Sequence, residues 1–231
     1  MKSNKLSIII PVYNEEKTIK ELVEKVKKVK LPIKKEIIVV DDCSKDRTPE
    51  ILKKIKGIKV VRHPGNKNLG KGNAIRTGLK NITGDIVIAQ DADLEYNPED
   101  YKKLVEPIIK GKAKVVYGSR NLGDKHEHSY LSYYIGGVFL SKLANLIYGI
   151  KITDEATCYK MLRVDVIKSL NLKCERFEFC PEVTAKVAKK GIEILEIPIS
   201  YSPRKMTEGK KIRWKDGVEA IWTLIKYKFV D

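Results

Sequence analysis

The chain has 231 residues, of which 42% are hydrophobic and 33% are charged, a balance typical of a soluble globular protein with a sizeable core. No stretch of 18 apolar residues predicts a transmembrane helix, and the first residues lack the apolar segment of a signal peptide, so we expect a cytoplasmic protein. The formal net charge of +16 fits nucleic acid, an anionic membrane surface or a phosphate-rich substrate as partner, or the lysine and glutamate enrichment of thermophile proteins. The four cysteines form no CxxC pair, which indicates neither a zinc site nor a disulfide framework.

Strand and helix signals alternate through the first half of the chain. Strands are expected at residues 6–12, 36–40, 59–62, 86–89 and 115–118. Helices are expected at residues 18–30, 48–55, 71–79 and 98–110. This alternation predicts an α/β fold with a mostly parallel central sheet flanked by helices.

The pattern changes after Gly123. Helices are expected at 130–150 and 181–190, with a strand near the end of 151–163 and another at 192–201. A strongly basic stretch at 204–215 then leads into a helix at 214–229. We therefore expect a main domain over residues 1–203, followed by a basic loop and a C-terminal helix over residues 204–231.

Two carboxylates, Asp91 and Asp93, follow the short apolar strand at 86–89 with Ala92 between them. Ligands of open α/β sheets bind at the carboxyl ends of the strands. Carboxylates at this place suit Mg²⁺ or Mn²⁺, and such a cation can hold the phosphates of a nucleotide. An acidic triplet alone is also compatible with an ordinary surface turn.

The first two strands end in further candidates for nucleotide binding. After Pro11, which ends the first strand, Tyr13 can stack on a base and Glu15 can accept hydrogen bonds from base or ribose. Asp41 and Asp42 end the second strand, where an acidic residue can accept a hydrogen bond from a ribose hydroxyl. Plain helix capping is the structural alternative in both places.

A glycine-rich stretch, Asn68-Leu69-Gly70-Lys71-Gly72-Asn73-Ala74, precedes the helix at 71–79. Its glycines permit close backbone approach, and Lys71 adds positive charge near a helix start, where anions bind. Its spacing matches neither the P-loop nor the G-x-G-x-x-G fingerprint. Any nucleotide is therefore expected to be held by carboxylates and a metal.

Five motifs occur together in order: Ile-Pro-Val-Tyr-Asn-Glu (10–15), Val-Asp-Asp-Cys-Ser-Lys-Asp (40–46), Asn-Leu-Gly-Lys-Gly (68–72), Asp-Ala-Asp-Leu-Glu (91–95) and Gly-Ser-Arg (118–120). With them the chain resembles family 2 glycosyltransferases of the GT-A fold. The subgroup that it resembles is the polyprenyl-phosphate glycosyltransferases of the dolichyl-phosphate mannose or glucose synthase type. The resemblance spans nearly the whole chain.

The resemblance implies a role for each motif residue. The implied metal ligands for Mg²⁺ or Mn²⁺ are Asp91, Asp93 and Glu95. The implied nucleotide-binding residues are Pro11, Tyr13, Glu15, Asp41, Asp42, Lys71, Asp91 and Ala92. The implied phosphate- or acceptor-binding residues are Arg120, Arg204, Lys210 and Lys211. Asp154, in a loop that relatives place near the sugar, is implied to orient it, so the expected catalytic residues are Asp91, Asp93, Arg120, Asp154 and Arg204.

Two positions differ from the family pattern. Relatives often have glycine near Cys158, which indicates a different sugar pocket, and many mannose synthases have glutamine where this chain has Glu95. The resemblance implies one inverting displacement, in which the phosphate of a polyprenyl lipid attacks a nucleotide-activated hexose of the GDP-mannose or UDP-glucose class. Because that phosphate is already anionic, no strong general base is required.

The C-terminal helix carries one apolar stripe. Its members are Trp214, Val218, Ile221, Trp222, Ile225 and Phe229. Packing on the core and contact with an anionic membrane surface both explain such a stripe. With the helix at 130–150 as a possible second interfacial helix, we expect a peripheral enzyme on the cytoplasmic face of a membrane.

Four other functions compete with this expectation. A glycosyltransferase with a soluble or protein acceptor stays open. A sugar-1-phosphate nucleotidyltransferase is expected to have a glycine-rich loop after its first strand, where this chain has Pro11-Val12-Tyr13. A nucleic-acid-binding module is expected to cluster aromatic and basic residues, so we expect no nucleic-acid partner. The presence of Asp91, Asp93, Arg120 and Arg204 argues against a catalytically inactive relative.

Overall fold

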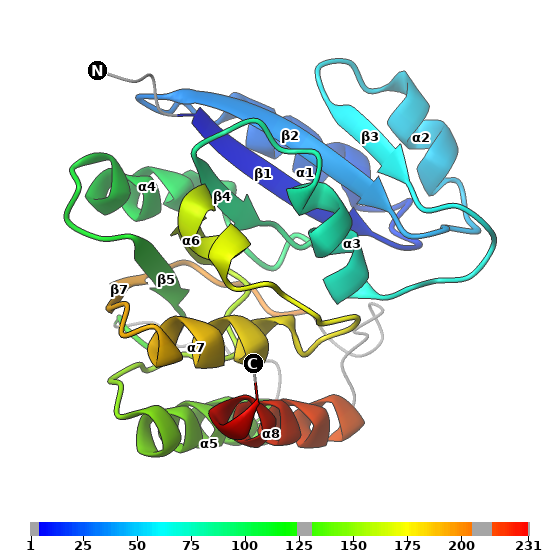
Figure 1. The fold of residues 1–231 in the computed structure, drawn as a ribbon. Helices are drawn as coiled ribbons and strands as arrows, with labels where there is room; N and C mark the ends of the chain where they lie inside the picture. Colours follow the sequence, from blue (N-terminus) through cyan, green and yellow to red (C-terminus); the bar gives the residue numbers. More distant parts are fainter. Residues whose placement is uncertain (1–4, 124–130, 205–213, 231) are drawn as a thin grey trace.

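The computed structural model describes residues 5–123, 131–204 and 214–230 (Figure 1). Within them one seven-stranded sheet has the order β3-β2-β1-β4-β6-β5-β7. The strands are β1 (Lys5–Val12), β2 (Lys34–Asp41), β3 (Lys59–Arg62), β4 (Ile86–Ala89), β5 (Val115–Ser119), β6 (Lys160–Arg163) and β7 (Ile194–Pro198). The expected α/β fold with a mostly parallel sheet is confirmed.

The directions of the strands determine where the candidate site residues lie. β6 runs antiparallel to both of its neighbours, β4 and β5, whereas every other pair in the sheet is parallel. The carboxyl ends of the six parallel strands and the amino end of β6 therefore lie at one edge of the sheet. The candidate residues that the structure describes lie in or next to loops at this edge.

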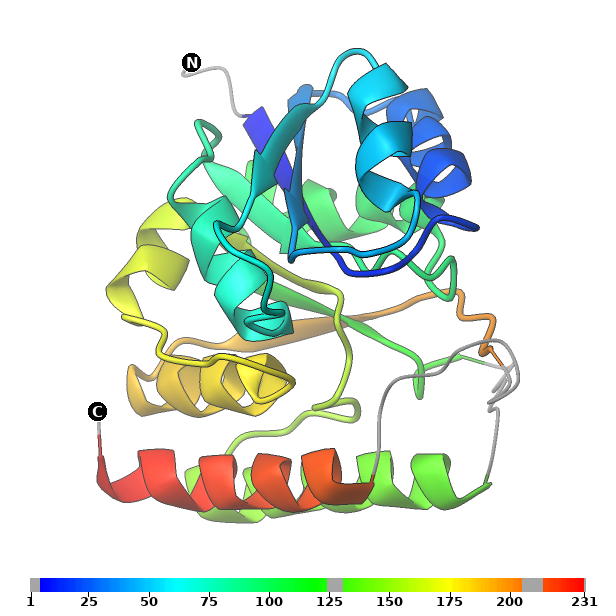
Figure 2. The same ribbon diagram turned by 90° about the vertical axis from the view of Figure 1, so that its right-hand side faces the viewer.

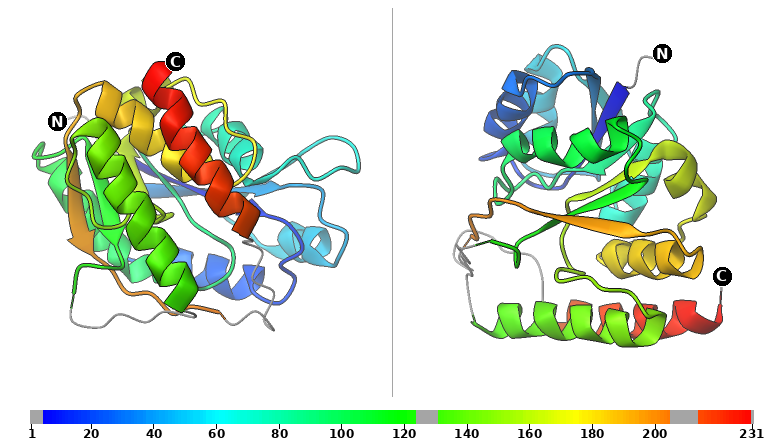
Figure 3. Two further views of the ribbon diagram at one scale, coloured as in Figure 1. Left: turned by 90° about the horizontal axis from the view of Figure 1, so that it is seen from below. Right: turned by 90° about the vertical axis from the view of Figure 1, so that its left-hand side faces the viewer.

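Helices cover both faces of the sheet. They are α1 (Ile19–Lys28), α2 (Thr48–Lys54), α3 (Lys71–Leu79), α4 (Tyr101–Ile109), α5 (Leu131–Tyr148), α6 (Val164–Ser169), α7 (Phe179–Lys189) and α8 (Trp214–Phe229). α3, α6 and α7 lie on one face, and α1 and α4 lie on the other (Figures 1 and 3). α5 and α8 lie side by side as an outer layer beyond α7 (Figure 2).

The apolar pattern of each element explains its place. In α1 the buried side chains Ile19, Leu22, Val23 and Val26 recur at the spacing of one helix face. In β1 every residue from Leu6 to Val12 is buried, because helices cover the sheet on both sides.

Several element boundaries differ from the expected ones. The expected helix at 98–110 begins as a 3₁₀ turn, Pro98–Asp100, in which the Asn97 side chain accepts from the Glu99 N–H. The strand expected at 192–201 covers only Ile194–Pro198, and α6 was not expected at all. α7 begins two residues before Pro181, which is tolerated in the first turn because its missing N–H has no partner to lose there.

The C-terminal helix packs with a different face from its apolar stripe. The side chains of α8 that are buried against the fold are Ala220, Thr223, Leu224 and Tyr227. In contrast, Trp214, Trp222 and Phe229 are 75%, 62% and 82% exposed. Most of this stripe therefore does not pack on the core, whereas its member Ile221 is partly buried against the apolar cluster that α5, α7 and α8 form. Within the described residues, no helix combines the length and apolar character needed to cross a bilayer.

Candidate active site

The predicted site residues come from loops at the same edge of the sheet. Glu15 follows β1, Asp91 and Asp93 follow β4, and Arg204 follows β7. Arg120 follows β5 directly, and Asp154 precedes the antiparallel strand β6. The topology thus brings together residues from both halves of the chain.

Asp91 is paired with a lysine from the glycine-rich stretch. Lys71, the first residue of α3, places its Nζ 2.6 Å from Asp91 Oδ1 and 3.5 Å from the Cys158 sulfur. Although burial opposes the charged form, the nearby Asp91 carboxylate raises the pKa of Lys71, so this amine is a permanent cation at the floor of the site. Burial raises the pKa of the Cys158 thiol, which therefore stays neutral.

Asp93 lies in a crowded group of carboxylates. Burial, together with the charges of Asp91 and Glu95, raises the pKa of Asp93 to about 7. Arg204 partly compensates, because its Nη2 lies 3.4 Å from Asp93 Oδ2 and its Nη1 lies 3.5 Å from Glu15 Oε2. The arginine therefore acts as an internal counter-ion for carboxylates from two different loops.

Glu95 anchors the segment that carries Arg204. Its Oε1 accepts from the Arg204 N–H at 2.9 Å, and its Oε2 accepts from the Tyr201 hydroxyl. A backbone bridge between Tyr96 and Tyr201 fixes the same two segments to each other. Both carboxylate oxygens of Glu95 are thus engaged by the 201–204 segment, and a metal would have to share them. That Glu95 is a metal ligand stays a prediction.

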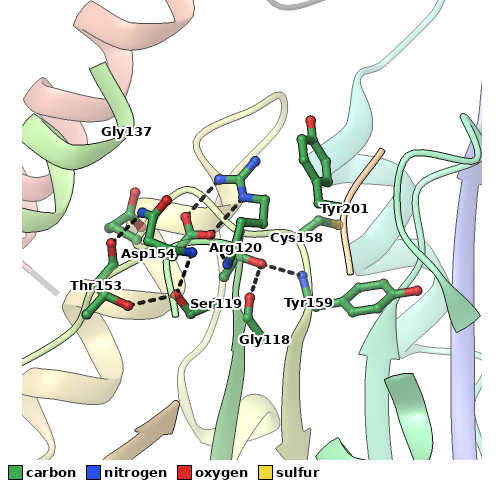
Figure 4. Close-up of polar contacts among 12 residues, drawn as sticks. Gly118, Ser119, Arg120, Gly137, Thr153, Asp154, Cys158, Tyr159 and Tyr201 are labelled. Carbon is green, nitrogen blue, oxygen red and sulfur yellow. Dashed lines mark hydrogen bonds and ion pairs between the residues drawn. The ribbon is translucent and has the colours of Figure 1, made fainter. Parts of the chain in front are cut away.

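Arg120 is held by a buried carboxylate. Its Nε lies 2.7 Å from Asp154 Oδ2 and its Nη2 lies 2.7 Å from Asp154 Oδ1, which makes a bidentate ion pair (Figure 4). Burial opposes ionisation of Asp154, but Arg120 holds the pKa of this carboxyl below its ordinary value. The guanidinium carbon is also 5.0 Å from the centre of the Tyr201 ring, so the side chain lies between Asp154 and Tyr201. Asp154 thereby sets the direction of Arg120.

Asp42 supports the loop before α3. Its Oδ1 lies 2.9 Å from His63 Nδ1 and accepts from the Leu69 N–H at 2.8 Å, while its Oδ2 accepts from the Gly70 N–H at 2.7 Å. Gly70 has a φ of +98°, and a Cβ there would lie 2.4 Å from the Glu175 carbonyl oxygen, so glycine is required. Asp42 therefore positions Lys71 through this turn. Direct nucleotide binding by Asp42 stays a prediction.

Asp41 has one carboxylate oxygen less occupied than the other. Oδ1 accepts from the Ser44 N–H at 3.0 Å, whereas among the described residues Oδ2 has only the Arg62 guanidinium near it, at 3.5 Å. Near it, Pro11 is buried within β1 and Tyr13 is partly exposed at the strand's end. Ala92 is buried between the two aspartates. Their binding of the nucleotide stays a prediction.

Two predicted residues cannot be placed in the structure, and two residues that support the site were not predicted from the sequence. Lys210 and Lys211 lie outside the described residues. The missed ones support the site: Glu196 Oε1 accepts from the Asp154 N–H at 3.0 Å, and the buried Gln90 Oε1 accepts from the hydroxyls of Tyr101 and Tyr159. A buried glutamine directly before Asp91 was a usable signal in the sequence, but nothing in the sequence pointed to Glu196.

The carboxylates of the site are suitable ligands for a hard divalent cation. Asp91 and Asp93 offer carboxylate oxygens at this end of the sheet. Burial, and after it the charges of Asp91 and Glu95, raises the pKa of Asp93, and a bound cation would favour its ionised form. Among residues 5–123, 131–204 and 214–230, no three His, Cys, Asp or Glu side chains converge as a complete metal cage. A cation such as Mg²⁺ can be held by one or two carboxylates together with substrate phosphates.

Comparison with known proteins relates the sequence of this chain to glycosyltransferases. Residues 7–170 match the sequence model of the family described as Glycosyl transferase family 2. A UDP-N-acetylglucosamine–dolichyl-phosphate N-acetylglucosaminyltransferase of Methanococcus voltae is 31% identical over 227 residues, covering 89% of this chain and 89% of that protein. A dolichol-phosphate mannosyltransferase of Pyrococcus furiosus is 31% identical over 218 residues, covering 89% of this chain and 59% of that protein.

The fold has a solved counterpart. The crystal structure of glucosyl-3-phosphoglycerate synthase from Mycobacterium tuberculosis, in complex with Mn²⁺, uridine diphosphate and glucosyl-3-phosphoglycerate, superposes with a TM-score of 0.74 at 19% identity, over 99% of this chain and 81% of that one. The expected GT-A fold is thereby confirmed. On its sequence match and its fold, the chain belongs to glycosyl transferase family 2 and is a glycosyltransferase.

Proposed function

We propose that the protein is a metal-dependent, inverting glycosyltransferase that moves a hexose from a nucleotide-sugar to a polyprenyl phosphate of the dolichyl type. The observation that carries this proposal is the convergence of two carboxylates, Asp91 and Asp93, with two guanidinium groups, Arg120 and Arg204, at one sheet edge. Carboxylates suit a metal-bound diphosphate, and guanidinium groups suit phosphate oxygens. The names of the two curated relatives, which specify dolichyl and dolichol phosphate, support the acceptor class.

The donor end of the site is built from the β1, β2 and β4 loops. Asp91 and Asp93 would hold Mg²⁺ or Mn²⁺ against the donor diphosphate. The bound cation would neutralise the charge that develops on the leaving nucleoside diphosphate. Lys71, fixed beside Asp91, supplies a permanent positive charge at the same place.

The acceptor end would use the two arginines. An acceptor phosphate oxygen attacks the anomeric carbon from the face opposite the leaving diphosphate, which inverts that centre. Arg120, aimed by Asp154, and Arg204, carried by the segment after β7, stabilise the phosphate charges during the displacement. The attacking phosphate is already anionic, so no side chain has to remove a proton.

The lipid of the acceptor needs an apolar surface close to this site. Exposed large apolar side chains gather on the outer layer of α5 and α8, among them Ile135, Phe139, Leu146, Trp214, Val218, Trp222 and Phe229. Exposed lysines of the same helices lie among them, at Lys142, Lys215, Lys226 and Lys228. Apolar and aromatic side chains interspersed with lysine suit the interface of an anionic bilayer, so we propose peripheral membrane binding through this layer.

The first experiment measures sugar transfer into an organic-extractable lipid. The purified chain is supplied with a polyprenyl phosphate, Mn²⁺ or Mg²⁺, and in turn labelled UDP-glucose, UDP-N-acetylglucosamine and GDP-mannose. We expect one donor to give labelled lipid, chelator to abolish it, and Asp93→Asn to lower it. Asp85→Asn, an exposed aspartate at the opposite end of β4, is the matched control and should retain activity.

The acceptor class is tested in parallel. Transfer to a soluble sugar phosphate or to a protein, with none to the lipid, would reject the lipid acceptor and favour the rival with a soluble or protein acceptor. Flotation with anionic vesicles tests the membrane face: Trp222→Glu and Leu146→Glu should weaken binding. Val60→Glu, at an apolar position 43% exposed on β3, should leave binding unchanged.

A further inference from the structure

The two faces of helix α5 differ in solvent exposure. On its outer face, Ile135, Phe139 and Leu146 are 57%, 52% and 82% exposed. On its inner face, Leu140 and Ala144 are buried in a small apolar cluster with residues of α7 and α8. Two polar side chains of this helix, Ser141 and Asn145, bind a neighbouring segment of the fold.

Ser141 and Asn145 hold the segment 152–155. The Ser141 hydroxyl accepts from the Glu155 N–H at 2.9 Å and donates to the Gly137 carbonyl within the helix, also at 2.9 Å. Asn145 binds both backbone groups of Ile152, accepting from its N–H and donating to its carbonyl, each at 2.9 Å. The segment is therefore attached to α5 at both of its ends.

The same segment carries Asp154, which aims Arg120. On its other side, Glu196 of β7 accepts from the N–H groups of Thr153 and Asp154 at 2.7 and 3.0 Å. Figure 4 shows the α5 ribbon at Gly137 beside Thr153 and Asp154, with Arg120 on their far side. Hydrogen bonds at both ends of the segment 152–155, and the Asp154 side chain within it, thus connect a helix with an exposed apolar face to Arg120.

We propose that α5 couples contact with a lipid bilayer to the placement of Arg120, with Ser141 and Asn145 as the positioning residues. This inference rests on the proposed function. Burial of the outer face of α5 in the interface restrains the helix, and its two side chains restrain the segment 152–155. The Arg120–Asp154 pair is then held in one geometry. Because Asp91 and Asp93 bind the donor from other loops, bilayer contact raises turnover and leaves donor affinity unchanged.

The test separates turnover from binding. The full chain is given saturating donor and a short, water-soluble polyprenyl phosphate, with and without vesicles of phosphatidylcholine and phosphatidylglycerol. We expect vesicles to raise kcat of the wild-type protein by about tenfold, within the usual range of coupling between two sites. Ser141→Ala and Asn145→Ala should lose this stimulation, while vesicle flotation and the melting-temperature shift with donor stay as in the wild type.

Two variants on the same helix serve as comparisons. Ser132→Ala changes an exposed serine of α5 and should keep full stimulation. Ser141→Thr retains the hydroxyl and should restore the stimulation that Ser141→Ala loses. Wild-type stimulation in both alanine variants would overturn the proposal. An active, vesicle-bound wild type whose kcat does not change with vesicles would overturn it too.

A measurement on the wild-type protein alone tests the proposal even if the alanine variants do not fold. Amide hydrogen exchange at Asp154 and Glu155 should slow when vesicles are added, without donor or acceptor present. Unchanged exchange of these amides on bound vesicles would overturn the proposal. Absence of transfer to any polyprenyl phosphate would instead reject the proposed function, so the two failures are distinguishable.

Discussion

Arg204 Nη2 lies 3.4 Å from Asp93 Oδ2, which joins the segment after the last strand to the acidic motif after β4. The same guanidinium reaches Glu15 at the end of β1, 3.5 Å away. The protein therefore neutralises carboxylates of two loops with an arginine from the distant C-terminal part of the sequence. A diphosphate with its cation would take over part of this charge balance and release the arginine toward phosphate oxygens.

The first prediction concerns this arginine. Arg204→Ala should lower kcat/KM for transfer by roughly 100- to 1000-fold, the usual effect of removing one group that stabilises transition-state charge. Steady-state kinetics at saturating metal measures the change. Arg163→Ala, an arginine at the opposite edge whose side chain is 49% exposed, is the control and should stay within twofold or so of wild type. Equal activity of the two variants would contradict a role for Arg204.

A second prediction compares two arginine–aspartate pairs of the same geometry. Asp154 is 1% exposed and pairs with Arg120, whereas Asp165 is 62% exposed and pairs with Arg163 through two contacts of 3.0 Å. Asp154→Asn should lower the free energy of unfolding by about 3–5 kcal/mol, because the Arg120 guanidinium, whose side chain is only 20% exposed, loses its counter-charge. Asp165→Asn should cost roughly 0–1 kcal/mol, since water screens the pair.

Urea unfolding of both variants gives the comparison, and transfer assays give a second readout. Asp154→Asn should also reduce kcat, because Arg120 is no longer aimed. Similar destabilisation by the two substitutions would show that burial does not distinguish these pairs.

A third prediction concerns the turn before α3. Gly70→Ala places a Cβ 2.4 Å from the Glu175 carbonyl oxygen at a φ of +98°. Gly65→Ala meets the same kind of backbone strain at a φ of +84° with nothing within 4 Å, and is the matched control. The control should lose about 1–3 kcal/mol of stability from backbone strain alone, and Gly70→Ala should lose more. Donor binding should weaken only in Gly70→Ala, because Lys71 moves from Asp91; thermal shift with a nucleoside diphosphate measures this.

A fourth prediction gives the pH dependence of stability. Burial would raise the pKa of Glu36, but hydrogen bonds from Lys5, Ser7 and Thr83 lower it from 4.5 to about 2. Because the folded-state pKa is depressed, this carboxylate stabilises the fold above pH 4.5 and loses that contribution as pH falls from about 4.5 to about 2.

Glu36→Gln should therefore flatten the fall in melting temperature over this range, and at neutral pH it should cost roughly 1.5–3 kcal/mol, as for hydrogen bonds to a charged group. Glu21→Gln, whose carboxylate is 57% exposed beside Lys25, is the control and should change neither quantity measurably. An unchanged acid profile in Glu36→Gln would mean that other groups control acid unfolding.

The sequence by itself determined the alternating framework and the chemistry of the site. Strands are short apolar runs and helices have one apolar face, so local periodicity located β1, α1 and β4 to within one or two residues. The acidic motif Asp91-Ala92-Asp93 stands at a strand end, and its residue types alone indicated a divalent cation that can hold the phosphates of a nucleotide. The transfer of a sugar, the subgroup of transferases and the roles of Arg120 and Arg204 came from the family resemblance.

Only the tertiary structure decided which partners these residues have. The antiparallel placement of β6 puts Asp154 beside Arg120, and long-range packing puts Glu95 under Arg204; neither depends on a pattern within a few residues. It also decided that Asp42 supports a loop, and that most of the apolar stripe of α8 faces outward while Leu224 and Tyr227 pack inward. A stripe in the sequence shows that one face of a helix is apolar, but which face the fold covers depends on the neighbours that surround it.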